Sequence, residues 1–396
     1  MCRYCAGETE QVARLKLPVP NKYYASQQEA IDAEKRPHNL HACKRCGSFM
    51  LSNTPFTPEE LFAGDYAFVP VGNTWKNHCV ELARELAKAL PENAPNERGV
   101  IYDIGGNDGV LSSVLYRVCD RTTMIVDPSD VAPFQDGIHW PKRKGFFGES
   151  FARDLLRNGE RLADAITATN VLAHVPAPLD FMRGVKTLLT PEGVACFEFP
   201  DGDIFGEKVL FDTVYAEHIG YLTLEGFVAL AERAGLYLYG VTHSVIHGGS
   251  VRAYLSHKKR SDLSERQKFN CRDFESAVAR KLAGLESKLD GKTFFGFGSA
   301  AKSVVVNSLV KPETAPRFII DETPAKIGRY QPNSGAFILP LPSTYREAMN
   351  YLEKDADDVI RNSEICVNYA WNYAYEVREK LTRAGFKGEI VTVHDF

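Results

Sequence analysis

The sequence has no apolar run of about 18 residues, the length at which a helix can cross a membrane, so we expect no membrane-spanning segment. It also has no excess of basic residues, because 47 lysines and arginines stand against 51 aspartates and glutamates, for a net charge of -4. This balance argues against nucleic-acid binding through a basic surface. The first residues contain no apolar stretch of the kind found in secretory signals, and we therefore expect a cytoplasmic protein.

The nine cysteines do not indicate a disulfide framework, because their number is odd and the chain is long and shows no secretory signal. Five of them stand alone in the sequence. We expect these five in the core, because cysteine is among the most buried residue types. They are Cys79, Cys119, Cys196, Cys271 and Cys366.

The other four cysteines form two Cys-x-x-Cys pairs. The pairs are Cys2 with Cys5 and Cys43 with Cys46. Four thiolates suit a tetrahedral zinc ion, and such a closed site leaves no position for chemistry at the metal. Residues 6–42 separate the pairs, a gap longer than the usual spacing of about 15–20 residues, so an iron–sulfur site or a reduced site without metal stays open. The nearby His38 and His41 are predicted to be surface residues rather than ligands.

At about 150 residues per domain, 396 residues predict two or three domains. The cysteine pairs and several prolines in residues 1–70 indicate a small, loop-rich module. From residue 71 to 255, short apolar runs alternate with segments long enough for helices, which favours an α/β fold with a parallel sheet. A second α/β unit is expected in residues 256–396.

The expected strands of the central unit end at or near glycine, asparagine or aspartate. They are residues 100–104, 123–127, 165–170 and 194–199, with a turn at 191–193 and a later strand at 251–254. The second unit has expected strands at 293–296, 318–321 and 365–368. Helical spacing of apolar residues predicts helices at 80–90 and within 262–290.

A glycine-containing turn, residues 103–109, follows the first strand of the central unit with the sequence Asp-Ile-Gly-Gly-Asn-Asp-Gly. Its spacing is not G-x-G-x-x-G, so it does not fit a dinucleotide fingerprint. A second acidic residue, Asp127, ends the next strand and can bind a ribose diol. The combination resembles class I S-adenosylmethionine-dependent methyltransferases, and an ordinary glycine turn is the alternative. The resemblance implies cofactor contacts from Asp103, Gly105, Asn107, Gly109, Asp127 and Asn170.

Two histidines are candidates for acid–base chemistry. His218 lies in the segment 215–221, which also holds a carboxylate and two phenols. His174 follows the end of an expected strand, where open α/β sheets bind ligands. Because histidine titrates near neutral pH, either side chain suits a general base.

Taken together, these motifs and several others resemble the nucleotide-sugar C-methyltransferases of deoxysugar biosynthesis, almost from end to end. The matching stretches are the cysteine pairs and residues 61–66, 104–109, 127–129, 170–174, 215–218, 247–252 and 371–372. The resemblance implies a zinc-binding N-terminal domain, a central class I methyltransferase domain and a C-terminal Rossmann-like domain. It also implies S-adenosylmethionine as cofactor and a sugar nucleotide held between the last two domains. We expect a monomer.

The family's reaction adds a methyl group to the carbon beside the keto group of a 4-keto-deoxysugar nucleotide. By resemblance, His218 is the base and Glu217 orients or polarises it, with His174 as the less favoured base. Tyr215 and His174 are expected around the keto oxygen and sugar hydroxyls. In the family, one of two tyrosines at positions 66 and 68 lines the site, and Tyr66 is the one that this chain keeps. The family usually has a second tyrosine where this chain has Phe68, so one phenol is missing.

The expected substrate-binding residues lie in three further segments. They are His247, Arg252, Gly298, Lys302, Trp371 and Asn372. Arginine can pair with a pyrophosphate, and backbone amides at a helix start can receive a phosphate. A turn without ligand and a packed C-terminal core are the alternatives. Methylation of oxygen or nitrogen on another small molecule, and a non-enzymatic adaptor, remain open as other functions.

Overall fold

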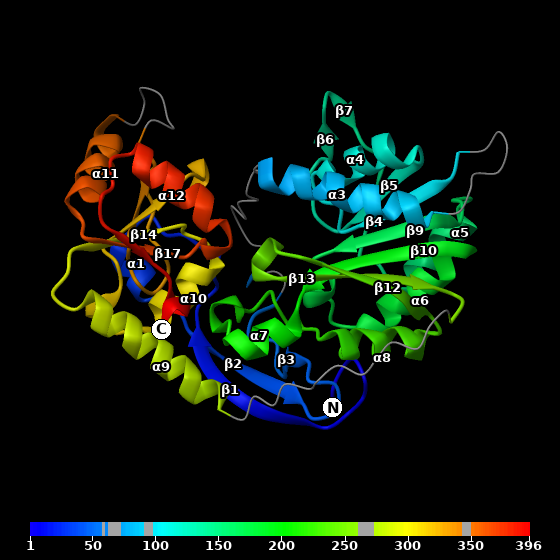
Figure 1. Cartoon of the computed structure of the whole chain (residues 1–396), viewed down its shortest axis with the longest axis horizontal. Coiled ribbons are helices and arrows are strands. Elements are labelled where there is room, and N and C mark those ends of the chain that lie inside the picture. The colour runs from blue at the N-terminus through cyan, green and yellow to red at the C-terminus, as the bar shows by residue number, and fades with distance from the viewer. Residues whose placement is uncertain (58–59, 62–72, 91–97, 260–272, 343–349) are drawn as a thin grey trace.

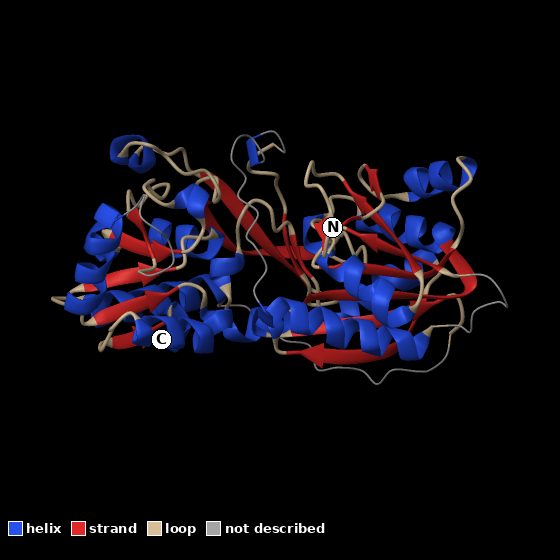
Figure 2. Ribbon diagram, turned by 90° about the horizontal axis from the view of Figure 1, so that it is seen from above, coloured by secondary structure: helices blue, strands red, loops and turns tan. Residues whose placement is uncertain are grey.

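Two α/β units lie side by side, and both contact the antiparallel sheet of the N-terminal module (Figure 1). The computed structural model describes residues 1–57, 60–61, 73–90, 98–259, 273–342 and 350–396. Figure 2 shows the same arrangement from above, with the two units at opposite ends of an elongated molecule.

The central unit is built on a seven-stranded sheet in the order β12-β13-β10-β9-β4-β5-β8. Its strands are β4 (Val100–Ile104), β5 (Thr122–Asp127), β8 (Lys142–Lys144), β9 (Ala163–Thr169), β10 (Leu189–Pro200), β12 (Tyr237–Ser244) and β13 (Ser250–Ser256). The five strands from β10 to β8 are parallel, and β13 and β12 complete the sheet as an antiparallel pair. Every residue of β4 is buried, as a strand covered on both faces requires.

Helices cover both faces of this sheet (Figure 1). They are α3 (Asn73–Ala89), α4 (Val110–Cys119), α5 (Glu149–Arg157), α6 (Pro178–Leu188), α7 (Gly202–Lys208) and α8 (Leu224–Ala234). Short elements complete the unit, namely the β6 (Phe134–Gln135) and β7 (Ile138–His139) hairpin and the 3-10 turns η1 (Leu172–His174), η2 (Phe211–Thr213) and η3 (Ile246–Gly248). Local sequence defines α8, because Thr223 accepts from the Gly226 N–H at its start and Gly235 is left-handed at its end.

The C-terminal unit has a five-stranded parallel sheet in the order β16-β15-β14-β17-β18. Its strands are β14 (Phe294–Phe297), β15 (Phe318–Asp321), β16 (Phe337–Pro340), β17 (Ile365–Asn368) and β18 (Glu389–Val391). Its helices are α9 (Phe274–Leu289), α10 (Ala301–Leu309), α11 (Asn350–Asn362) and α12 (Ala374–Arg383), with 3-10 turns η4 (Pro312–Thr314), η5 (Pro324–Lys326), η6 (Trp371–Tyr373) and η7 (Val393–Asp395).

The N-terminal module is a sheet, which corrects the expectation of a loop-rich module. It consists of β1 (Thr9–Leu17), α1 (Gln27–Ile31), β2 (Arg36–Cys43) and β3 (Phe49–Leu51), and its fourth strand is β11 (Gly220–Tyr221) from the central unit. Apolar side chains alternate with polar ones along the second half of β1, a period-two pattern that indicates a strand. Strand β1 packs against α9 and α10, so the module touches both units.

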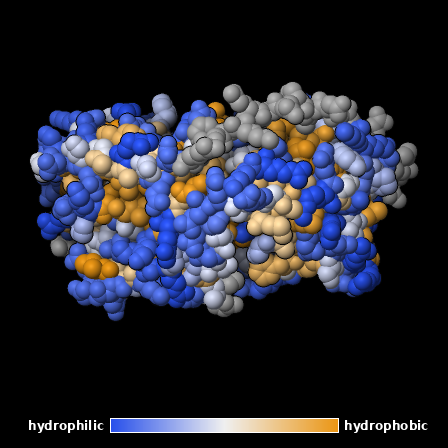
Figure 3. All heavy atoms as spheres, turned by 90° about the horizontal axis from the view of Figure 1, so that it is seen from below, coloured by the Kyte–Doolittle hydropathy of each residue, from blue (hydrophilic) through white to orange (hydrophobic). Residues whose placement is uncertain are grey.

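The strands expected in the two α/β units are confirmed, with small differences at their ends. The turn expected at residues 191–193 lies within β10, where the pairing with β9 changes register between Leu189 and Val194. Among the described residues, no helix is long and apolar enough to cross a membrane. On the face seen from below, hydrophobic residues are interspersed with hydrophilic ones (Figure 3). Four of the lone cysteines are buried as expected, while Cys271 lies outside the described residues.

His38 is fully buried, so its prediction as a surface residue is wrong. The ring packs beside Phe56, and Nδ1 donates to the Arg36 carbonyl over 3.0 Å. The alternation of β2 places position 38 on the covered face of the sheet, and a neutral imidazole fits there. Burial lowers the pKa of His38 to about 4.

The low pKa of His38 predicts a loss of stability in acid. The unfolded chain takes up the proton near its ordinary pKa of about 6.5, whereas the folded chain takes it up near pH 4, so stability falls as the pH drops through this range. The loss from this residue is about 3 kcal/mol. Urea unfolding at pH 7 and pH 4 measures it. His38→Leu should lose less stability than the wild type, and the exposed control His139→Asn should lose as much. Equal losses in all three would contradict this account.

Candidate active site

The glycine turn after β4 lets two backbone segments approach closely. Gly105 and Gly109 adopt left-handed φ angles of 73° and 84°, and Asn107 has a φ of 48°. A Cβ atom on Gly105 would lie 2.5 Å from Cγ2 of Val171, which follows the end of β9. Glycine is therefore required here both by conformation and by space.

Asp103 holds this turn from inside the protein. Its carboxylate accepts hydrogen bonds from the hydroxyls of Ser112 at 2.6 Å and Thr167 at 2.8 Å. Burial raises the pKa of Asp103 to about 6 despite these bonds. Protein donors thus contact both oxygens, so Asp103 supports the turn from inside, and its contact with a cofactor stays a prediction.

Asp127 and Asn107 lie on the outer side of the turn. Asp127 accepts from the Asn107 N–H at 3.1 Å and from the Ser129 N–H at 2.8 Å. The Asn107 Oδ1 atom is buried and has no hydrogen-bond partner among the residues that the structure describes. An unpaired buried acceptor is costly, so this atom fits a site that a ligand donor completes.

Asn170 brings the next segment to the same edge of the sheet. Its φ is 57°, and its N–H donates to the Glu198 carbonyl over 2.8 Å. This hydrogen bond joins the residue after β9 to the neighbouring strand β10. The chain then passes Val171, which faces Gly105, and enters η1 with His174. The segments predicted to bind the cofactor, around Gly105 and Asn170, therefore lie next to the segment that carries the predicted catalytic residue His174.

His174 is held as a neutral imidazole. Its Nδ1 lies 2.8 Å from the Glu217 carbonyl oxygen. Because a carbonyl only accepts, the proton is on Nδ1 and the lone pair is on Nε2. Desolvation by the surrounding residues lowers the pKa of His174, which favours the same neutral form, although part of its surface is exposed. The ring centre lies 4.9 Å from that of His218.

His218 has the geometry of a base. Its Nδ1 donates to the Thr213 carbonyl over 3.2 Å, which leaves the lone pair on Nε2. The Tyr215 hydroxyl donates to Nε2 over 2.9 Å, and the two rings stack. The Tyr221 hydroxyl donates to the same Thr213 carbonyl over 3.0 Å. Tautomer and ring orientation are therefore both fixed by one backbone oxygen.

The Glu217 side chain hydrogen-bonds to the N-terminal module. Its Oε1 accepts from Nδ2 of Asn21 in the N-terminal module over 2.9 Å. This contact differs from the expected orienting contact with His218, which the Thr213 carbonyl makes instead. Burial raises the pKa of Glu217. Tyr66 and Phe68 lie outside the described residues.

The C-terminal unit contacts the segment just before His218. Asp212 is buried and accepts from Trp371 Nε1 at 2.7 Å and from His394 Nε2 at 3.0 Å. The Lys302 ammonium lies 3.8 Å from the centre of the Trp371 ring, a cation–π contact. Burial lowers the pKa of Lys302. Trp371 and Lys302 are thus brought together. Trp371 contacts Asp212, the residue that precedes Thr213, whose carbonyl orients His218.

A cavity of about 480 Å³ opens where the two units meet. Its lining residues are Lys208, Leu210, Val245, Gly248, Trp371, Asn372, Thr392 and His394. It therefore contains the predicted Trp371 and Asn372, while Tyr215 and His218 are not among its lining residues. His247 lies in η3 beside this cavity.

Two predicted substrate residues are engaged with the protein itself. Arg252 is buried, with ion pairs of 2.7 Å to both Glu198 and Glu85, which differs from the expected pairing with a pyrophosphate. Gly298 has a φ of 89°, and the next residue, Ser299, donates its N–H to Asp321. The hydroxyl of Tyr23 donates to the Ser299 carbonyl over 2.6 Å, so the N-terminal module occupies this turn.

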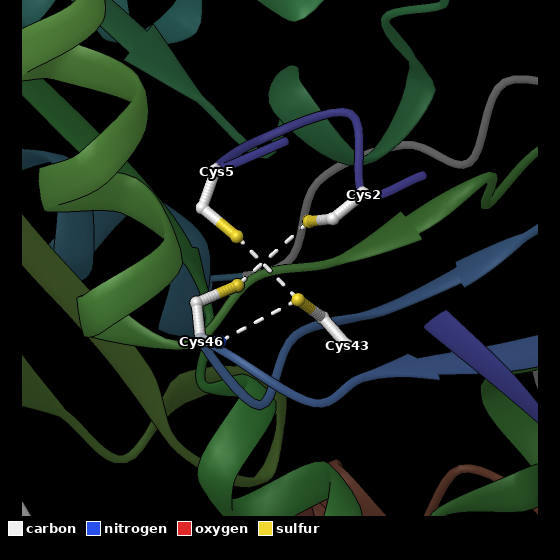
Figure 4. Close-up of side chains that lie close together, drawn as sticks. All are labelled: Cys2, Cys5, Cys43 and Cys46. Atoms are coloured by element: carbon white, nitrogen blue, oxygen red, sulfur yellow. Dashed lines mark hydrogen bonds between the residues drawn. The ribbon is translucent and has the colours of Figure 1, made fainter. Parts of the chain in front are cut away.

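The four paired cysteines converge on one point (Figure 4). Their sulfur atoms all lie within 4.8 Å of one another, with Cys2 and Cys46 separated by 3.8 Å and Cys5 and Cys43 by 3.4 Å. A tetrahedral ion with bonds of about 2.3 Å needs sulfurs about 3.8 Å apart. The cluster therefore fits a tetrahedral metal ion.

The cysteine cluster is joined to the catalytic segment. The Thr223 hydroxyl, which caps α8, donates to the Cys46 carbonyl over 2.6 Å, and β11 pairs with β3 directly after His218. Sequence reasoning missed this connection, as well as Asn21, Asp212 and Thr213. Asp212 and Thr213 immediately precede the motif at 215–218 and could have been included, whereas Asn21 lies in a proline-containing loop with no recognisable pattern.

Comparison with known proteins identifies the central unit. A family described as methyltransferase domain matches residues 76–240. The C-methyltransferase NovU of Streptomyces niveus is 25% identical over 404 residues, covering 95% of this chain and 90% of the relative. A ubiquinone biosynthesis O-methyltransferase of Actinobacillus pleuropneumoniae is 29% identical over 103 residues, covering 24% of this chain and 44% of the relative.

Solved structures are also similar to parts of this chain. CalO1, a methyltransferase in calicheamicin biosynthesis determined with SAH bound, is 16% identical, with a TM-score of 0.34 and coverage of 46% of this chain and 55% of CalO1. TnmH is 18% identical, with a TM-score of 0.33 and coverage of 47% and 56%. The match of the methyltransferase family and the observed sheet confirm the expected α/β fold with a central class I methyltransferase domain.

The geometry of Gly105 predicts a selective loss of cofactor binding. In Gly105→Ala the new methyl group meets Val171, so the turn must shift and the affinity for S-adenosylmethionine should fall at least about tenfold. Gly159→Ala is the matched control, because Gly159 has a φ of 85° and open space around it. It should cost about 1 kcal/mol of stability and leave binding unchanged. Calorimetric titration measures both, and equal affinities would contradict the placement of the donor at this turn.

Proposed function

We propose that the protein methylates carbon in a nucleotide-linked 4-keto-deoxysugar, because residues 76–240 match a methyltransferase domain and the chain is similar to a C-methyltransferase over nearly its whole length. The methyl group goes to the carbon beside the keto group. The observation that supports this proposal best is the Tyr215–His218 pair, a fixed imidazole with its lone pair on Nε2, adjacent to the glycine turn.

A carbon beside a keto group becomes nucleophilic only when it loses a proton. His218 Nε2 is the acceptor of that proton in our proposal, because Nδ1 is already committed to the Thr213 carbonyl. As the proton arrives, the imidazolium keeps its Nδ1–H bond to this carbonyl, which stabilises the charge. The electron pair of the broken C–H bond moves into the enolate of the substrate.

Tyr215 and His174 surround the oxygen of that enolate. When substrate enters, the Tyr215 hydroxyl turns from Nε2 toward the keto oxygen and donates a hydrogen bond there. His174 presents a lone pair on Nε2, which accepts a hydrogen bond from a sugar hydroxyl. One donor and one acceptor thereby fix the orientation of the sugar ring.

The residues at the carboxyl ends of β4, β5 and β9 hold the methyl donor. When bound, S-adenosylmethionine supplies an electrophilic methyl group on a sulfonium. Asn107 offers an unpaired Oδ1, Asp127 offers a carboxylate for the ribose hydroxyls, and Gly105 gives the close approach of the backbone. Asn170 places the adjoining segment beside this turn.

The nucleotide part of the substrate is assigned to the junction with the C-terminal unit. Trp371 and Asn372 line the cavity there, and the Lys302 ammonium lies against the Trp371 ring. An aromatic face suits a base, and an ammonium suits a phosphate. We leave Arg252 and Gly298 out of this site because protein contacts occupy them.

We assign zinc to the four-cysteine cluster, in a structural role. Four thiolates fill a tetrahedral shell and leave no position for substrate. Elemental analysis of purified protein should find one zinc per chain, and Cys43→Ala should lose the metal and stability together, with activity lost only through folding. Protein with full activity and no bound metal would contradict the assignment.

The base assignment predicts the fate of the substrate α-proton in deuterated water without methyl donor. Wild-type protein should exchange it, His218→Ala should lower the exchange rate at least about 100-fold, and Tyr215→Phe should lower it about tenfold. Binding of S-adenosylmethionine, followed by calorimetry, should stay unchanged in both variants.

The exposed His243→Ala is the control for these variants and should exchange at the wild-type rate. Unchanged exchange in His218→Ala would overturn its role as the base. Absence of exchange in the wild type, with methylation still observed, would favour an oxygen or nitrogen acceptor.

A further inference from the structure

The segment after β1 joins the N-terminal module to both α/β units. Asn21 donates from Nδ2 to Glu217 of the central unit over 2.9 Å. Two and three residues later, Tyr23 donates to the Ser299 carbonyl and Tyr24 exchanges backbone hydrogen bonds with Tyr330 of the C-terminal unit. Buried Pro18 and Pro20 precede Asn21 and restrict the backbone that carries it.

Glu217 depends on Asn21 for its orientation. Its side chain is 9% exposed, and among the described residues no cation pairs with it and no other group donates to its carboxylate. Tyr23 lies nearby but gives its hydroxyl proton to Ser299. The amide of Asn21 thus fixes Oε1, and Oε2 is the oxygen left for a ligand.

The same residue serves the catalytic cluster through its backbone. The Glu217 carbonyl accepts from His174, and His218 follows directly in sequence. Glu217 therefore contacts His174 through its backbone and the N-terminal module through its side chain. This coupling makes the N-terminal module part of the active site rather than only a stabilising domain.

We propose that Asn21 is a positioning residue that holds Glu217 Oε1 so that Oε2 hydrogen-bonds a hydroxyl group of the bound substrate. The inference rests on the proposed function, in which the substrate is a sugar. Asn21 itself acts through Glu217 and makes no contact with the reacting carbon.

The test compares Asn21→Leu with Lys22→Ala, a change at the exposed neighbouring position in the same loop. Asn21→Leu removes the only amide donor to the carboxylate among the described residues, so kcat should fall about tenfold. The KM for S-adenosylmethionine and the metal content should stay unchanged, while the melting temperature should fall because a buried carboxylate loses its donor. Asn21→Asp should lower kcat more than Asn21→Leu does, because it replaces the donor to Glu217 with a second carboxylate that repels it. Lys22→Ala should match the wild type.

A double variant separates positioning from a merely structural role. If Asn21 acts through Glu217, then Asn21→Leu should lower kcat no further in a Glu217→Ala background. Additive losses in the double variant, or equal kcat in Asn21→Leu and Lys22→Ala, would overturn the inference. If Asn21→Leu does not fold, Asn21→Asp carries the same comparison at nearly constant size. A wild type without α-proton exchange would instead count against the proposed function.

Discussion

The catalytic account depends on one backbone oxygen, the carbonyl of Thr213. It accepts the Nδ1–H of His218 and so places the lone pair on Nε2, and it also accepts from Tyr221. A histidine without such a partner would exchange tautomers and turn about its side-chain bonds. In the proposed mechanism, the position of η2, which carries Thr213, therefore decides whether His218 is available as a base.

All three parts of the chain fix the segment from 212 to 221. The C-terminal unit holds Asp212 through Trp371 and His394, and the N-terminal module pairs β3 with β11 just after His218. The cysteine cluster contributes through the cap of α8. In the proposed mechanism, these contacts give the two further domains a role in holding the segment that carries His218.

Much of this arrangement could be predicted from the sequence. Short apolar runs such as residues 100–104 indicate buried parallel strands, and the cysteine spacing indicates a common site, because both patterns are local. The sheet of the N-terminal module was missed because its alternation is short and its last strand comes from residues 220–221. The contacts of Asn21 and Arg252 could not be predicted, since their partners lie 196 and 54 residues away in the chain and are brought close only by folding.

Mass spectrometry of the reaction product tests the central claim most directly. Purified protein would be incubated with S-adenosylmethionine and a panel of nucleotide-linked 4-ketosugars that differ in base and in substituents. The account predicts the gain of one methyl group on the sugar fragment, resistant to conditions that cleave ethers. A methyl group on oxygen or nitrogen, or no methylation across the panel while S-adenosylmethionine still binds, would contradict it.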